Sequence, residues 1–169
     1  MAASFAASHG DIARVLRTMI RAPEFSASLG QGFKDPMHFA VSAVRLAYDG
    51  RVILNPDPMI GWINRLGEGL YAHETPDGYS LAAAAWIAPG QMSARFDIAR
   101  AIGNGSAGLF KPRDAGQAEA PAFPQLQNAL YYQTLQPRLL PATRGALDQA
   151  RSPQEWNALF LSSPDFMQR

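Results

Sequence analysis

Apolar residues near the start of the chain recur with the period of an α-helix. One stripe takes positions i, i+3, i+4, i+7 and i+8, which are occupied by Ile12, Val15, Leu16, Met19 and Ile20. Such a stripe is typical of an amphipathic helix, and Arg14, Arg17 and Arg21 fall on the opposite face. Ser8, followed three residues later by Asp11, resembles a capping box and predicts where this helix begins.

Proline after a capping residue marks further helix starts. Asp35 followed by Pro36 predicts a helix that Asp49-Gly50 ends. Its expected shared face consists of Met37, Val41, Val44 and Tyr48. Further helices are expected from about 55–58 to 71, 80 to 86, 89 to 102, 124 to 135, 141 to 150 and 153 to 161. In the helix that Pro89 opens, the residues spaced for burial are Met92, Phe96, Ala99 and Ile102.

The pattern as a whole favours one fold class. Helical periodicity dominates, and the short apolar run Val52-Ile53-Leu54 does not outweigh it. We therefore expect an all-α fold, a compact bundle of about six to eight short helices with proline-led corners and no significant sheet.

One corner sequence occurs twice, as a small residue, proline, an acid and phenylalanine. The two copies centre on Pro23, Glu24 and Phe25 and on Pro164, Asp165 and Phe166. Proline disfavours helical backbone in the residue before it and suits the first position of a new turn, where the helix dipole favours an acid. We expect each phenylalanine to pack on the helix just ended. When the copies are aligned, Asn157 opposite Leu16 is the mismatch in an otherwise apolar stripe. The motif is interpreted as a structural corner.

Composition limits the class of protein. At 169 residues the chain fits one domain, so we expect a single helical domain over 1–169. Apolar residues make up 47%, and charged residues make up 17%, which is below the usual quarter, so the composition is that of a globular and not of a disordered protein. The absence of cysteine excludes disulfides and thiolate chemistry. Fifteen basic against fourteen acidic residues leave a net charge of +1, which disfavours nucleic acid and membrane surfaces as partners.

Two regional features add to this. No apolar run approaches the ~20 residues that span a bilayer. The run 103–121 is rich in glycine, alanine and charge, and is expected to be a long flexible loop.

Two motifs suggest chemistry but do not meet its structural requirements. GNGSAG, residues 103–108, matches G-x-G-x-x-G, yet dinucleotide binding needs a strand before the glycines, and here a predicted helix precedes them. HETPD, residues 73–77, begins like a zinc helix, but Pro76 interrupts the turn and Asp77 replaces the second histidine. A looser cation site of Glu74, Asp77 and backbone oxygens stays open beside the interpretation as a solvated turn. We therefore expect no cofactor and no metal.

Aromatic residues gather in sequence around the HETPDGY turn. The candidate ligand-binding residues are Trp62, Tyr71, His73, Glu74, Asp77, Tyr79, Trp86 and Arg95. Aromatic rings beside carboxylates suit sugar or peptide recognition. Rings at helix ends are also ordinary members of the edge of a core, so both interpretations remain open.

Four stretches together resemble one family. In chain order they are FAASHGDIARVLRTMIRAPEF, KDPMHFAVSAVRLAYDG, LGEGLYAHETPDGYSLAAAAWIAPGQMSARFDIARAIGNG and the terminal LFLSSPDFMQR. They are similar to the C-terminal part of a bacterial family of uncharacterised helical proteins, the domain-of-unknown-function family numbered eighteen hundred. Tyr79 stands in the Pro-x-Gly-aromatic turn where the family usually has tryptophan.

The resemblance implies an all-α fold without an established activity. It also implies that this chain is the C-terminal portion of a longer protein whose full-length relatives look exported, which suggests an envelope or periplasmic location. Helical faces here would then be covered by the missing N-terminal part, by another protein or by a second copy in a homodimer.

Three functions are carried forward. The first is a non-catalytic protein-interaction or scaffold module of an envelope-associated protein, favoured because no nucleophile, base and orienting group assemble in the sequence. The second is a ligand- or carbohydrate-binding site around the HETPDGY turn. The third is part of a hydrolase whose catalytic residues lie outside this chain.

Overall fold

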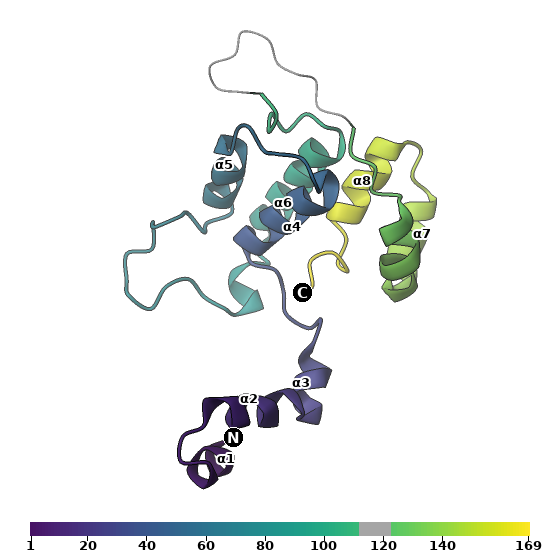
Figure 1. Cartoon of the computed structure of the whole chain (residues 1–169). Coiled ribbons are helices and arrows are strands. Elements are labelled where there is room, and N and C mark those ends of the chain that lie inside the picture. The colour runs from purple at the N-terminus through teal and green to yellow at the C-terminus, as the bar shows by residue number, and fades with distance from the viewer. Residues whose placement is uncertain (112–122) are drawn as a thin grey trace. The chain divides into compact units, whose positions relative to one another are not determined.

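Residues 1–111 and 123–169 are described by a computed structural model of the chain. Within these ranges no strand forms apart from an isolated antiparallel bridge between Phe33 and Gln168, and the predicted all-α fold class is confirmed. The chain divides into two compact units (Figure 1). The N-terminal unit comprises residues 1–32 with Arg169, and the main unit comprises residues 33–168. The single domain expected over 1–169 stays a prediction.

The N-terminal unit consists of short helices with little buried surface. They are α1 (Ala2–Ala7), α2 (Ile12–Ile20) and α3 (Pro23–Ser28), and none of their residues is buried. The carboxylate of Asp11 caps α2 by accepting a hydrogen bond from the Arg14 N–H at 3.2 Å. Ser8 instead ends α1, so the expected capping box is wrong. Gly10, with a φ of +88°, turns the chain between Ser8 and the start of α2.

The main unit contains the longer helices. They are α4 (Pro36–Tyr48), α5 (Asp57–Arg65), α6 (Pro89–Gly103), α7 (Pro141–Asp148) and α8 (Pro153–Leu161), joined by the single turns η1 (Ala83–Ala85), η2 (Tyr131–Leu135) and η3 (Gln136–Arg138). Proline stands in the first turn of each α-helix of this unit, where its missing N–H costs no hydrogen bond. Asp35 and Ser152 cap α4 and α8 with their side chains.

Helices α4, α6 and α8 surround the core of the main unit (Figure 1). The buried side chains they contribute include Phe39, Ala43, Ile98, Ile102, Trp156, Phe160 and Leu161. Helices α6 and α8 approach closely at Gly103, where an added Cβ atom would lie 2.9 Å from the Asn157 Cβ atom. The buried Asn157 amide donates hydrogen bonds to the carbonyl oxygens of Gly103 and Pro124, at 3.0 and 2.9 Å. A buried polar side chain therefore fixes this crossing.

Three helices differ from their predicted extents. Helix α5 ends at Arg65 and does not reach residue 71, because Gly67 takes a φ of +89°. The segment 80–86 forms only the η1 turn. The segment 124–135 is helical only from residue 129, and the Pro124 carbonyl is taken by Asn157.

Helix α6 buries most of the predicted face but leaves out Phe96. Ala99 and Ile102 are buried as expected, but Phe96 remains 42% exposed. The neighbouring Arg95 is fully buried in its place. The predicted burial of Phe96 is therefore wrong.

About half of the expected loop 103–121, from residue 112 on, lies outside the described residues, which resume at 123. In its described part, Gly103 is the last residue of α6, and the following Leu109 and Phe110 are buried. The Leu109 carbonyl accepts hydrogen bonds from the N–H groups of Leu54 and Asn55, at 3.0 and 2.9 Å. Residues 109 and 110 are thus part of the core.

Candidate functional site

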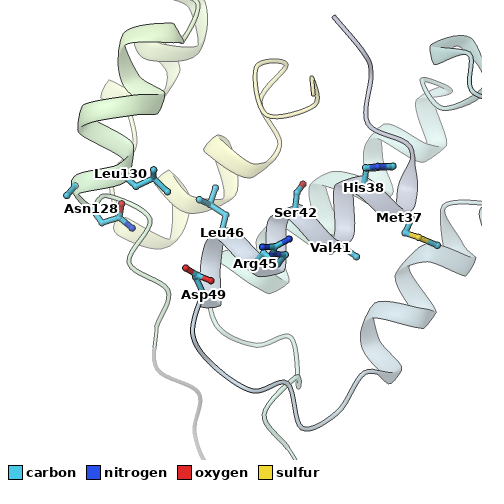
Figure 2. A pocket seen from close by; sticks show the side chains of 10 residues that line it. Met37, His38, Val41, Ser42, Arg45, Leu46, Asp49, Asn128 and Leu130 are labelled. Carbon is cyan, nitrogen blue, oxygen red and sulfur yellow. The ribbon is translucent and has the colours of Figure 1, made fainter. Parts of the chain in front are cut away.

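A groove of about 810 Å³ runs along one side of α4 (Figure 2). We call it the α4 groove. It is lined by Met37, His38, Val41, Ser42, Arg45, Leu46, Asp49, Asn128, Ala129 and Leu130. Figure 2 shows the labelled side chains following α4 from Met37 and His38 to Asp49, with Asn128 and Leu130 on the side of Leu46. Its volume falls in the range of pockets that bind small molecules.

Helix α4 forms this groove because it is apolar on two sides. Phe39, Ala43 and Val44 enter the core, while Met37 and Val41 point away from it and Val41 remains 37% exposed. The sequence pattern assigned Met37, Val41, Val44 and Tyr48 to one face of the helix, and their spacing in α4 places them so, but the core covers only the second half of that face. Val44 and Tyr48 are buried, whereas Met37 and Val41 line the groove.

The opposite wall begins where the chain enters η2. Asn128 stabilises this start, since its amide donates to the Gln125 carbonyl at 2.9 Å and its side-chain oxygen accepts from the Tyr131 N–H at 3.2 Å. Leu130, two residues further on, is 50% exposed. The wall therefore presents an apolar side chain on a backbone fixed by hydrogen bonds.

Polar groups lie at intervals along the groove. At one end the His38 Nδ1 atom is 2.6 Å from the Asp35 carboxylate, which also caps α4. The Ser42 hydroxyl donates to the Phe39 carbonyl at 3.3 Å. Within the described part of the chain, the Arg45 guanidinium has no hydrogen-bond or ion-pair partner. The groove thus offers a cation that a carboxylate of a bound molecule can pair with.

Glu68 supports the start of α4 from a neighbouring segment. Its Oε2 atom accepts a hydrogen bond from the Met37 N–H at 2.7 Å. Burial raises the pKa of the Glu68 carboxyl, and the hydrogen bond from Met37 partly offsets this rise. The first turn of α4, and hence the end of the groove, is fixed by Asp35 and Glu68 together.

Some of the residues predicted around the HETPDGY turn do come together. The rings of His73 and Tyr79 meet edge to face with centroids 4.7 Å apart, and Tyr79 and Trp86 have centroids 6.2 Å apart. The Tyr79 hydroxyl donates to the Gly69 carbonyl and the Trp86 indole N–H to the Ser80 carbonyl, both at 2.8 Å. These polar atoms therefore hold the segment itself.

The acidic and remaining aromatic residues of this set have different surroundings. The Asp77 carboxylate accepts a hydrogen bond from the Thr75 hydroxyl, which holds the pKa of Asp77 below its usual range. Glu74 is exposed, and Tyr71 extends fully into solvent from a left-handed backbone position with a φ of 59°. Trp62 is half-buried against the core.

Arg95 lies apart from the turn, in the core. Its Nη2 atom donates to the Lys34 carbonyl at 2.8 Å and its Nη1 atom contacts the Met167 sulfur at 3.4 Å. The guanidinium lies over the rings of Phe33 and Phe39, 5.0 and 4.9 Å from their centroids. Burial lowers the pKa of Arg95 to about 10, an effect that Asp35 and Glu68 partly oppose, so the group is charged at neutral pH.

The α4 groove contains none of the eight residues predicted from the sequence. The sequence signal that points to the groove is the number of apolar residues on α4, which is larger than one core-facing side of the helix can bury. Within residues 1–111 and 123–169, no group of three or more histidine, aspartate or glutamate side chains is arranged to hold a metal ion. None of the helices in the same ranges is both long and apolar enough to cross a bilayer.

The sequence model of the family described as "Protein of unknown function (DUF1800)" matches residues 1–168. The chain belongs to this family. The resemblance noted in four separate stretches is therefore confirmed for DUF1800 over essentially the whole chain. No curated protein and no solved structure matches the chain.

Proposed function

We propose that this DUF1800 chain is a non-catalytic interaction module that binds an amphipathic helix of another protein in the α4 groove. The observation that carries the proposal is the second apolar side of α4, with Val41 and Leu130 exposed on opposite walls. Exposed apolar surface in a concave site is typical of a binding surface.

The dimensions of the groove favour a helix as the occupant. From Met37 to Asp49 the helix axis rises about 18 Å, which matches roughly three turns of a partner helix. Such a partner would present apolar residues at helical spacing to Met37, Val41 and Leu46.

The charges of the groove favour a particular partner chemistry. Arg45 has no polar partner among the described residues, and Asp49 stands one helical turn further along. A partner helix with a carboxylate opposite Arg45 and a basic residue one turn away complements both charges. The family resemblance supports a search for this partner among proteins of the bacterial cell envelope.

Helical peptide probes test the proposal. Two fluorescent, helix-stapled peptides of about three turns would carry the same leucine stripe and differ only by glutamate or lysine at the position facing Arg45. Fluorescence polarisation is expected to show tighter binding of the glutamate peptide, by about tenfold. Val41→Glu and Leu130→Glu are expected to abolish binding, and Arg45→Ala to remove the preference between the peptides.

Leu81→Glu is the matched control, because Leu81 is 90% exposed and does not line the groove. Binding lost equally in Leu81→Glu, or no preference between the two peptides in the unmodified protein, would contradict the proposal.

A second candidate function is ligand binding at the HETPDGY turn. The contact between His73 and Tyr79, and the fully exposed ring of Tyr71, support it. Titration with a panel of neutral and acidic oligosaccharides, followed by tryptophan fluorescence, tests it. A saturable change that Tyr71→Ala removes is expected, and an unchanged signal across the panel argues against a carbohydrate site.

A further inference from the structure

Lys34 stands at a tightly held point of the main unit. Its backbone N–H donates to the Met167 carbonyl at 2.7 Å, and its own carbonyl accepts from Arg95 at 2.8 Å. The isolated bridge between Phe33 and Gln168 lies beside it. The backbone of Lys34 is thus fixed on both sides, which limits where its side chain can go.

The ammonium group of Lys34 lies over an aromatic ring. Its Nζ atom is 3.6 Å from the centroid of the Phe166 ring. Among residues 1–111 and 123–169, no oxygen forms a hydrogen bond or ion pair with this atom. The ring face attracts a cation, but it cannot stabilise one as a carboxylate does.

Burial and a charge on another element make the ammonium less stable. Burial, with a further effect of the Arg95 guanidinium, lowers the pKa of Lys34 from 10.5 to about 8. The neighbouring acids Asp35 and Glu68 act on Arg95. About half of the Lys34 side chains are therefore neutral amines at pH 8, against about one in 300 for an ordinary lysine.

Desolvation and a neighbouring cation are the two conditions that activate a lysine as a nucleophile. The side chain is partly exposed, so a small reagent can reach it. Lys111 is the other lysine of the sequence, and it is exposed. The chain therefore contains its own comparison between a partly buried and an exposed amine.

We propose that Lys34 is an acylation site that takes its acyl group from an activated donor, a thioester or an acyl phosphate. The neutral amine attacks the carbonyl carbon, an N–C bond forms, and the C–S or C–O bond breaks. The thiolate or phosphate leaves with the electron pair, and the amine proton passes to water. The product is an uncharged amide over Phe166. This inference does not depend on the proposed function of the α4 groove.

Acetyl phosphate and the full chain provide the test. The protein would be treated at pH values from 6.5 to 10, and acetylation of Lys34 and Lys111 would be measured in separate peptides by mass spectrometry. Lys34 is expected to react about tenfold faster than Lys111 at pH 7.5 to 8, with a rate that levels off above pH 8. A blocked lysine peptide, whose rate keeps rising towards pH 10, is the reference.

Two further measurements distinguish activation of the Lys34 amine by its surroundings from simple accessibility of the amine to the reagent. Arg95→Met removes the neighbouring cation and is expected to slow acetylation of Lys34 several-fold at pH 7.5 while leaving Lys111 unchanged. If this variant does not fold, the titration of ¹³C-dimethylated Lys34 by NMR, in the Lys111→Arg protein, provides the same information. A midpoint near 10 in that titration, or acetylation of Lys34 no faster than that of Lys111, would overturn the proposal.

Discussion

The two proline–acid–phenylalanine corners have nearly the same sequence and very different surroundings. At the first, Pro23 begins α3, and the preceding helix leaves Leu16 47% and Ile20 54% exposed. At the second, the corner after α8 lies in the core, and Phe166 packs against Phe160 with ring centroids 5.9 Å apart.

The difference shows what a corner motif determines. Local chemistry ends the helix and turns the chain in both copies. Burial depends on which other segments contact the corner. At the second copy, specific hydrogen bonds are present. The Asp165 carboxylate accepts from the Leu140 N–H at 3.2 Å, and the Ser163 hydroxyl oxygen accepts from the Phe166 N–H at 3.1 Å. The same motif can therefore follow an exposed helix or form part of a hydrophobic core.

Truncation of the aligned pair Phe160 and Met19 is expected to give the largest contrast. Phe160 is 3% exposed, so Phe160→Ala is expected to lower the free energy of unfolding by about 3–5 kcal/mol. Met19→Ala, at a half-buried position of the mostly exposed helix in the other copy, is expected to cost less than about 1 kcal/mol. Urea unfolding measures both, because the three tryptophans report on the main unit and far-UV circular dichroism on all helices. Similar costs would mean that the first helix is also buried.

Exchange of the mismatched pair tests the polar contact in the second copy. Asn157→Leu is expected to cost about 2–4 kcal/mol, because the carbonyls of Gly103 and Pro124 lose their donor inside the core. Leu16→Asn is expected to change stability by less than about 0.5 kcal/mol, since Leu16 is exposed. The same unfolding measurement applies, and a stabilised Asn157→Leu protein would show that the amide is not needed for packing.

A methyl group at Gly103 probes the same crossing from α6. Its Cβ atom would lie 2.9 Å from the Asn157 Cβ atom and 3.1 Å from the Ala158 nitrogen, so Gly103→Ala is expected to cost about 1–3 kcal/mol. Gly145→Ala in α7 is the control, because nothing lies within 4 Å of its added Cβ atom and alanine favours the helix by up to about 1 kcal/mol. Equal effects of the two substitutions would contradict close packing at Gly103.

The last contrast concerns pH at the second corner. The pKa of Lys34 is about 8 in the folded chain and 10.5 when unfolded, so the unfolded state binds more protons between these values. The free energy of unfolding is expected to rise with pH across this window. Burial raises the pKa of Tyr48 to about 12, which lowers stability again above pH 10. The increase in the free energy of unfolding between pH 8 and 10 should be absent in the Lys34→Met protein. An increase of equal size in this variant would mean that another group causes the pH dependence.

Local signals predicted much of the fold. The starts of α4 and α8 follow from Asp35 and Ser152, because a cap is formed by residues within one turn of each other. The predicted end of α5 at residue 71 was wrong, since Gly67 is the left-handed residue beyond the helix.

The candidate site depended on contacts that sequence patterns do not contain. Arg95 is buried because it meets Lys34 and Met167, which are 61 and 72 residues away along the chain. The α4 groove likewise needs a second wall, which residues 128–130 supply from far along the sequence. The pattern of one helix identifies its apolar positions, but it does not show which of these residues remain outside the core.

The bridge between Phe33 and Gln168 means that the main unit begins and ends at the same point. A segment whose two ends are hydrogen-bonded neighbours can be inserted into a surface loop of a host protein with little separation of the loop ends. It can also be circularly permuted, with a short linker joining 33 to 168 and new termini opened at an exposed turn. The main unit is therefore suited to insertion into other proteins, because its two ends lie side by side.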